Sequence, residues 1–194
     1  MKKFEMTEET ITRSGKKLFR VKALISFGNV REGEMGGFIE NENNLSHDGE
    51  AWVYKEAEVK DDAMILDNAW VYGNAKVGGN ARICGDAEIY ENASVDDEAY
   101  VGGDAKVGGN AHLCRDALVC SDADYVCIRG LGSSNRTATF FQTRNGIGVS
   151  CGCFSGTLQE FRERVKERHG NSRYAKEYFM AADLMELHFE RHEK

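Results

Sequence analysis

The sequence predicts a mainly β fold whose central part is a regular coil of short strands, and three observations support this. Alanine recurs every six residues from Ala51 to Ala123, thirteen times without a gap. A larger side chain, aliphatic in every unit but the last, follows each alanine two positions later. The chain has 21 glycines and no proline, so glycine, asparagine and aspartate must form the turns. Because residues two apart on a strand point to one face, each unit adds a small and a branched side chain to a shared interior.

Residues 1–36 are expected to form a small β cap in front of the coil. A strand-like run covers residues 18–25, and a glycine-rich turn region follows at 33–37. The end of a β coil exposes unpaired strand edges and an apolar interior, so a terminal cap is expected on physical grounds.

Residues 37–128 are expected to form the coil itself, with three six-residue units closing one turn. Each residue then lies above the residue eighteen positions earlier, about 4.8 Å away. This register places a ladder of aromatic side chains on the outside of one face: Trp52, Tyr54, Trp70, Tyr72 and Tyr90. Aromatic residues are enriched at protein interfaces, which favours self-association through this face. The alternative is that the aromatics only stabilise neighbouring turns, as cross-strand pairs do in any sheet.

Residues 129–194 are expected to form a separate module of a hairpin and two helices (ββαα). The six-residue pattern stops, and a polar, glycine-rich link without that register follows at 127–136. Asn145-Gly146 is a strong hairpin signal, and a two-residue turn there would set Phe140 opposite Cys151.

Two helices are expected after this hairpin. Thr157 and Glu160 form a capping box, which starts a helix that ends near His169. The last helix is expected over about residues 172–190.

The repeat, in which an aliphatic residue precedes a small one by four positions, as in Val53 and Ala57, resembles the hexapeptide-repeat left-handed β-helix. The resemblance implies the left hand of the coil, and it implies a homo-oligomer, most often a trimer. Further segments resemble uncharacterised hexapeptide-repeat proteins of phages and prophages: 36–40, 44–46, 135–137, 151–154 and 169–170. The likeness covers nearly the whole chain. It implies a phage protein acting in the host cytoplasm, and it implies no particular activity.

Charge is distributed unevenly along the chain, whose formal net charge is −7. Residues 49–126 hold six basic and sixteen acidic residues, whereas residues 127–194 hold eleven basic and eight acidic ones. The acidic coil argues against duplex nucleic acid as a partner, because binding to the phosphate backbone requires clustered lysine and arginine. An anionic partner is therefore expected to bind the C-terminal module.

The glycine-rich link offers backbone N–H groups, hydroxyls and an arginine, which are the components of an anion cradle. The residues expected to bind the phosphates of a small nucleotide, or an acidic protein surface, are Ser133, Ser134, Asn135, Arg136, Thr137, Arg144 and Arg173, with Arg162 nearby. Arginine suits this role because its fork of N–H groups matches phosphate and carboxylate oxygens. The alternative is a simple linker.

Catalysis and metal binding are the less favoured interpretations, and no cofactor is predicted. Many hexapeptide-repeat acyltransferases use an interface histidine as general base, which would be His112 here. Those enzymes usually carry a protruding loop in the coil, whereas residues 51–126 are uninterrupted. Cys151 and Cys153, with His169, form an incomplete zinc set, because no second cysteine pair follows at zinc-finger spacing.

The sequence therefore leads to a hypothesis of function. It describes a non-enzymatic, oligomeric binding protein of phage type, which interferes with a host defence system by sequestering a nucleotide-like ligand or by binding a host protein. A polymer-forming assembly protein and an acyltransferase are the alternatives. No apolar run approaches the roughly 20 residues of a membrane span, and no apolar segment follows the first lysines, so a cytoplasmic protein with reduced cysteines and no membrane contact is expected.

Overall fold

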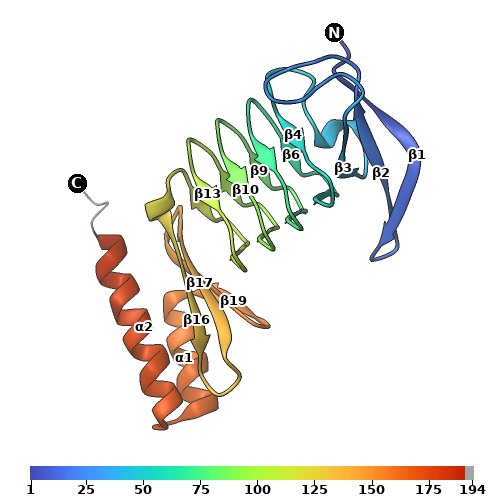
Figure 1. Ribbon diagram of the computed structural model, residues 1–194. Coiled ribbons are helices and arrows are strands. Elements are labelled where there is room, and N and C mark those ends of the chain that lie inside the picture. Colours follow the sequence, from blue (N-terminus) through green and yellow to red (C-terminus); the bar gives the residue numbers. More distant parts are fainter. Residues whose placement is uncertain (191–194) are drawn as a thin grey trace.

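The computed structural model describes residues 1–190, in which a β-solenoid of about five turns lies between an N-terminal sheet extension and a C-terminal module (Figure 1). The solenoid strands are two residues long: β4 (Trp52–Val53), β5 (Glu58–Val59), β6 (Met64–Ile65), β7 (Trp70–Val71), β8 (Lys76–Val77), β9 (Arg82–Ile83), β10 (Glu88–Ile89), β11 (Ser94–Val95), β12 (Tyr100–Val101), β13 (Lys106–Val107), β14 (His112–Leu113) and β15 (Leu118–Val119). They stack in parallel on three faces, in the orders β4-β7-β10-β13, β5-β8-β11-β14 and β6-β9-β12-β15.

The parallel stacking predicted from the six-residue repeat is confirmed. Residues eighteen apart pair with each other, as Val53 does with Val71. The alanines from Ala51 to Ala117 and the aliphatic residues two positions after them are almost completely inaccessible to solvent, and they form one continuous core. Ala123 is exposed and lies in the short 3-10 helix η2 (Asp122–Asp124), so the regular coil ends before it.

The backbone hydrogen bonds between successive turns of the solenoid run in one direction. The N–H of Trp52 donates to the carbonyl of Ala69 at 3.0 Å, and each later turn repeats this pattern toward the next. The backbone carbonyls of the first turn therefore have no partner within the solenoid. The same holds for the backbone N–H groups of the last turn, and both sets need partners from outside the solenoid. The two ends of the coil thus require caps of opposite hydrogen-bonding character.

The N-terminal segment provides the first of these caps. It forms β1 (Phe4–Arg13), β2 (Lys16–Ala23), β3 (Met35–Ile39) and the 3-10 helix η1 (Glu42–Asn44). β1, β2 and β3 pair antiparallel, and β3 pairs in parallel with β5, so one face of the solenoid continues into a seven-stranded sheet. This cap also encloses Trp52.

The sequence predicted that Trp52 belongs to an outward ladder of aromatic side chains, and this prediction is wrong. Trp52 is fully buried, with the rings of Phe4 and Phe27 at centroid distances of 6.4 and 5.4 Å. The repeat does place its side chain outside the coil, but the N-terminal segment folds across it. Burial of one aromatic surface by others stabilises the cap on the first turn.

The C-terminal module is a four-stranded antiparallel sheet with two helices, rather than the predicted two strands and two helices. Its elements are β16 (Tyr125–Leu131), β17 (Arg136–Thr143), β18 (Gly146–Cys151), β19 (Phe154–Thr157), α1 (Leu158–His169) and α2 (Arg173–Phe189). The first half of the segment expected to be a link, residues 127–131, therefore belongs to strand β16. Residues 191–194 of the predicted module lie outside the described part of the chain. Neither helix is long and apolar enough to cross a membrane.

The hairpin of β17 and β18 has a different register from the predicted one. Phe140 pairs with Val149, and Cys151 pairs with Ala138, two residues from the expected partner. The turn lies one residue earlier, and in it the hydroxyl of Thr143 accepts a hydrogen bond from the N–H of Asn145 at 3.2 Å. A shift of two residues keeps every side chain on its expected face, so the two faces of the sheet are unaffected.

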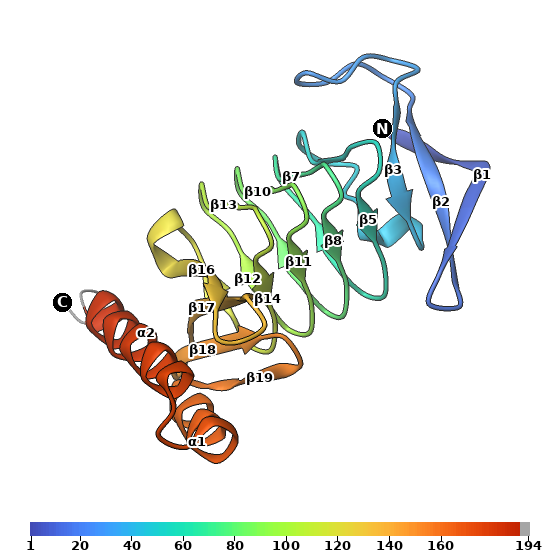
Figure 2. The same cartoon turned by 60° about the horizontal axis from the view of Figure 1, so that its bottom comes forward.

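These two faces join the module to the rest of the protein. Figures 1 and 2 show α1 and α2 on the side of the sheet that faces away from the solenoid. Phe140 packs with the buried residues of both helices, whereas its neighbour Phe141 packs into the core of the solenoid. The sheet therefore separates two cores, and strand β17 contributes one phenylalanine to each.

Candidate ligand-binding site

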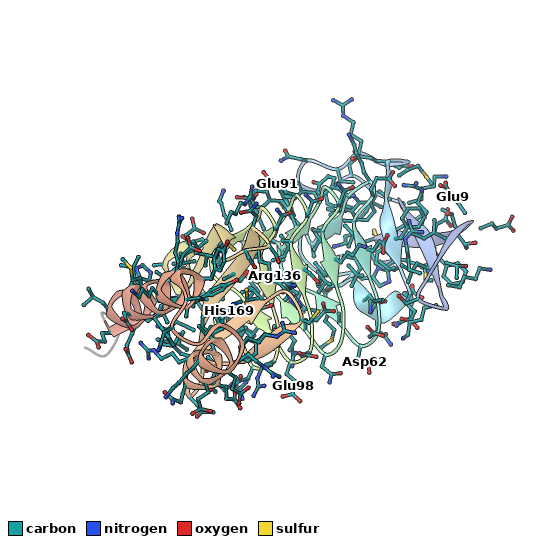
Figure 3. The ribbon with its side chains drawn as sticks, turned by 90° about the horizontal axis from the view of Figure 1, so that it is seen from below. Glu9, Asp62, Glu91, Glu98, Arg136 and His169 are labelled. Atoms are coloured by element: carbon teal, nitrogen blue, oxygen red, sulfur yellow. The ribbon has the colours of Figure 1, made fainter. Side chains whose placement is uncertain are left out.

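A cavity of about 710 Å³ lies in the C-terminal module, where α1 faces the turn between β18 and β19. Small-molecule sites usually have volumes of about 300 to 1,000 Å³. Figure 3 labels two of its residues, Arg136 from the start of β17 and His169 from the end of α1. The cavity thus brings together segments that are more than thirty residues apart in the sequence.

Arg136 reaches the cavity because of the local chain path. It is the first residue of β17 and follows a tight turn in which Asn135 has a positive φ of 47° and donates to Gly132. The N–H of Gly132 is bound in turn by the Glu177 carboxylate of α2 at 2.8 Å. A side chain at Gly152 would overlap the guanidinium of Arg136, so this glycine leaves the space that the arginine occupies.

Aromatic rings form the wall of the cavity opposite solvent. Phe161 of α1 is 3% exposed, and its ring lies 5.6 Å from that of Phe154 and 5.7 Å from that of Tyr178. The ring of His169 lies 5.6 Å from Tyr178. Such a cluster is rigid, because each ring is held by its neighbours, and it offers an apolar surface beside the arginines.

The acidic side chains at the cavity already have partners. The N–H of Thr157 donates to Glu160 at 2.7 Å and holds the pKa of this carboxyl below its usual value. Glu163 accepts from the amide of Gln159 at 2.8 Å, and Glu167 lies 3.6 Å from Arg164.

Two cationic groups at the cavity remain without such a partner. Arg136 and Arg168 form no ion pair with any carboxylate of residues 1–190, and His169 lies beside them in the lining. Their positive charge is therefore available to a bound anion.

Cys151, Cys153 and His169, the alternative metal ligands of the sequence analysis, all line this cavity. No group of three or more His, Cys, Asp or Glu side chains with metal-binding geometry occurs within residues 1–190. Burial raises the pKa of the Cys151 thiol, and the nearby Arg136 opposes this only in part. Without a metal, Cys151 therefore stays a protonated thiol near neutral pH, and zinc binding at these residues stays a prediction.

The structure divides the residues that the sequence grouped into one anion site. Only Arg136 lines the cavity. Ser133, Ser134 and Asn135 form the exposed tip of the β16–β17 turn, and Thr137 is half-buried on β17.

The remaining arginines of that group lie elsewhere. Arg144 follows the far end of β17, on the order of 25 Å from Arg136 at the usual rise per residue. Arg173 is exposed at the start of α2, and Arg162 is bound by Asp183 and Glu186.

Several cavity residues were missed in the sequence: Phe154, Phe161, Arg164, Arg168 and Tyr178. A signal for the helical ones was present, since Phe161, Arg164 and Arg168 follow the i, i+3, i+7 spacing of one helix face. That spacing predicts a shared face, but it does not predict that the turn between β18 and β19 lies opposite.

His112 lies at a second hollow, of about 410 Å³, between the solenoid and β19. Its Nδ1 is 2.7 Å from the hydroxyl of buried Ser150, and its Nε2 is 3.7 Å from Asp96, whose pKa this contact holds below its usual value. Both ring nitrogens thus face groups of the protein itself, so the histidine links the solenoid to the module. The acyltransferase hypothesis stays a prediction.

The other four aromatics of the predicted interface are half-buried on the solenoid surface. Trp70 packs edge-on against Tyr54 at 5.9 Å, and Tyr72 stacks on Tyr90 at 5.4 Å. The hydroxyl of Tyr72 donates to Glu88 at 2.6 Å. These contacts join successive turns of one chain, and self-association through this face stays a prediction.

Comparison of the chain with models of known protein families gives no match, and comparison with curated protein sequences gives none. The solenoid architecture is compatible with a hexapeptide-repeat β-helix. An assignment of function therefore depends on the geometry and chemistry of the cavity.

Proposed function

We propose that this is a binding protein whose C-terminal module takes a small anionic ligand with an aromatic part, such as a nucleotide, in the cavity beside α1. The observation that carries the proposal is the convergence of Arg136 and Arg168, both without a carboxylate partner in residues 1–190, on an aromatic wall. A guanidinium binds phosphate oxygens through paired N–H groups. Tyr178 and Phe154 offer the apolar surface that a nucleobase requires.

The solenoid contributes rigidity rather than chemistry in this proposal. Its core is continuous and close-packed, so it holds the module in a constant geometry. The resemblance to phage proteins suggests sequestration of a nucleotide-like signal inside a host cell as the biological role, with capture of a host protein as the other form of the same proposal. Both stay predictions.

Isothermal titration calorimetry tests the proposal with defined probes. Adenosine and guanosine mono- and diphosphates are titrated into the full-length protein, with adenosine and inorganic phosphate as partial ligands. We expect at least one nucleotide to bind more tightly than either partial ligand. Arg136→Gln and Arg168→Gln should each weaken binding by about ten- to a hundredfold, since a charged hydrogen bond to an anion contributes about 1.5 to 3 kcal/mol.

Arg144→Gln is the matched control, because it removes the same charge at the far end of β17. Its affinity should equal that of the unmodified protein. Binding that is absent for every nucleotide, or equally strong in the Arg136 and Arg168 variants, would contradict a nucleotide site in this cavity.

A further inference from the structure

The last helix carries an apolar stripe on the side that does not face the sheet. Met180, Leu184 and Leu187 are 71, 56 and 61% exposed, and their i, i+4, i+7 spacing places them on one face. We call these three residues the α2 stripe. The opposite face of α2 is buried against the module. A helix that is apolar on both faces is usually covered on both, because contiguous exposed apolar patches mark interaction sites.

Charges along α2 are separated toward its two ends. Arg173 and Lys176 lie in its first turn, and neither forms an ion pair with a carboxylate of residues 1–190. Asp183 and Glu186 lie in its second half, where Arg162 of α1 is the one cation that binds both of them within residues 1–190. Glu190 is the residue that caps its C-terminus. A helix with one basic end and one acidic end complements a second copy of itself in the antiparallel orientation only, because a parallel pair sets like charges together.

We propose that the α2 stripe is the contact between two copies of this chain, with the two α2 helices antiparallel about a twofold axis. In this arrangement Met180 and Leu184 pack against the partner's Leu184 and the partner's Met180, which satisfies the reciprocity of a twofold interface. Lys176 lies beside the acidic end of the partner helix. The opposed helix dipoles also favour this orientation.

The position of α2 leaves room for a second copy. Figures 1 and 2 both show the helix on the outer side of the module, with the sheet between it and the solenoid. The contact leaves the cavity beside α1 open, so it is independent of the proposed ligand. An anionic membrane surface fits this face poorly, because the stripe is short and Asp183, Glu186 and Glu190 surround its second half.

Sedimentation equilibrium of the full-length protein over a range of concentrations tests the proposal. We expect a monomer–dimer equilibrium, and Leu184→Asp should weaken the dimer at least tenfold because it places a charge at the centre of the contact. The side chain is exposed in the monomer, so the circular dichroism spectrum of the variant should be unchanged. Asn145→Asp adds the same charge at an exposed turn and serves as the control, with unchanged dimerisation.

A charge exchange tests the orientation. Lys176→Glu should weaken the dimer several-fold, and adding Glu190→Lys to it should restore the original affinity. In a parallel dimer Lys176 would face the partner's Lys176, so Lys176→Glu would exchange one like-charge pair for another and would not weaken the dimer. A monomer at all concentrations, an oligomer unaffected by Leu184→Asp, or a double variant without recovery would each overturn the proposal.

Discussion

Lys3 is a charged side chain buried at the start of the solenoid, with 2% of its surface exposed. Its ammonium group donates to the carbonyl of Ala51 at 2.9 Å and to that of Gly49 at 3.3 Å. These are carbonyls of the first turn, which have no preceding turn to bind them. Burial lowers the pKa of Lys3 to about 8, against the opposing effect of Asp48 and Glu50. A single lysine thus acts as a donor cap, and it bears a desolvation cost for its charge.

The desolvation cost of the Lys3 charge predicts that the free energy of unfolding depends on pH in the alkaline range. Between pH 8 and 10 the unfolded chain keeps the Lys3 proton while the folded protein loses it, so the free energy of unfolding should rise with pH by up to about 1.4 kcal/mol per unit. The measurement is urea unfolding of the natural protein and of Lys3→Met at several pH values. The difference between the two should move in favour of the natural protein as the pH rises.

Lys2→Met is the control for this experiment. Lys2 is exposed and forms a surface ion pair with Glu42 at 3.1 Å, so its removal should leave the pH dependence in this window unchanged. A stability difference between the natural protein and Lys3→Met that is constant from pH 8 to 10 would show that the lysine stays charged when folded.

The short elements at the two ends of the coil are shaped by the one-way direction of its hydrogen bonds. At the beginning, the amide of Asn44 in η1 donates to the carbonyls of Asp61 and Ala63 at 3.0 and 2.8 Å. At the other end, the hydroxyl of Thr139 in β17 accepts from the N–H of His112 at 3.0 Å. At the start of the coil, side-chain donors therefore bind the backbone carbonyls that have no preceding turn. At its end, a side-chain acceptor binds a backbone N–H group that has no following turn.

Asn44→Ala tests the capping role of η1. The Asn44 side chain is buried, and its oxygen also accepts from the N–H groups of Glu40 and Asn41. Its removal leaves several backbone groups unsatisfied, so we expect a loss of about 2 to 4 kcal/mol in the free energy of unfolding. Urea denaturation with an unchanged m-value is the measurement.

Asn43→Ala is the matched control, because Asn43 is exposed in the same short helix. It should change stability by less than about 0.5 kcal/mol. Equal effects of the two substitutions would mean that the helix propensity of the segment, and not the cap, determines the stability.

For the molecule as a whole, the main feature is the presence of two cores that share one sheet. The solenoid and the N-terminal cap form one core, and α1, α2 and the outer face of the sheet form the other. Phe141 is the module's fully buried contribution to the solenoid core. Gly148, its cross-strand neighbour, leaves the space for its ring, because a side chain there would overlap it.

Hydrogen exchange measured by mass spectrometry should distinguish the two cores. Phe141→Ala is expected to increase exchange in the last solenoid turn, near residues 112–119, because it leaves a cavity at the junction. Phe140→Ala removes a ring of the same size from the other face, and it should increase exchange in α1 and α2 instead. The same exchange pattern in both variants would show that the protein unfolds as one cooperative unit.

Local patterns in the chain predict local structure well, as particular elements show. The capping box at Thr157 and Glu160 starts α1 as expected, and helix α1 ends at His169. The predicted hairpin register was wrong by two residues, and the observed turn contains a hydrogen bond from the N–H of Asn145 to the hydroxyl of Thr143 that the Asn-Gly signal alone does not predict. Of the predicted anion site, Arg136 alone lines the cavity, since strand β17 is extended and carries Arg144 far away.

The six-residue repeat alone was sufficient to predict the stacked coil, its core and the pairing of residues eighteen apart. Each turn has the same pattern of small and aliphatic residues, so every turn favours the same conformation. The fold of the coil can therefore be predicted without knowledge of any single long-range contact. The burial of Trp52, the cavity at Arg136 and the two faces of Phe140 and Phe141 appear only in the folded molecule. They arise where segments far apart in the chain meet once, and the free energy of such a contact leaves no periodic trace in the sequence.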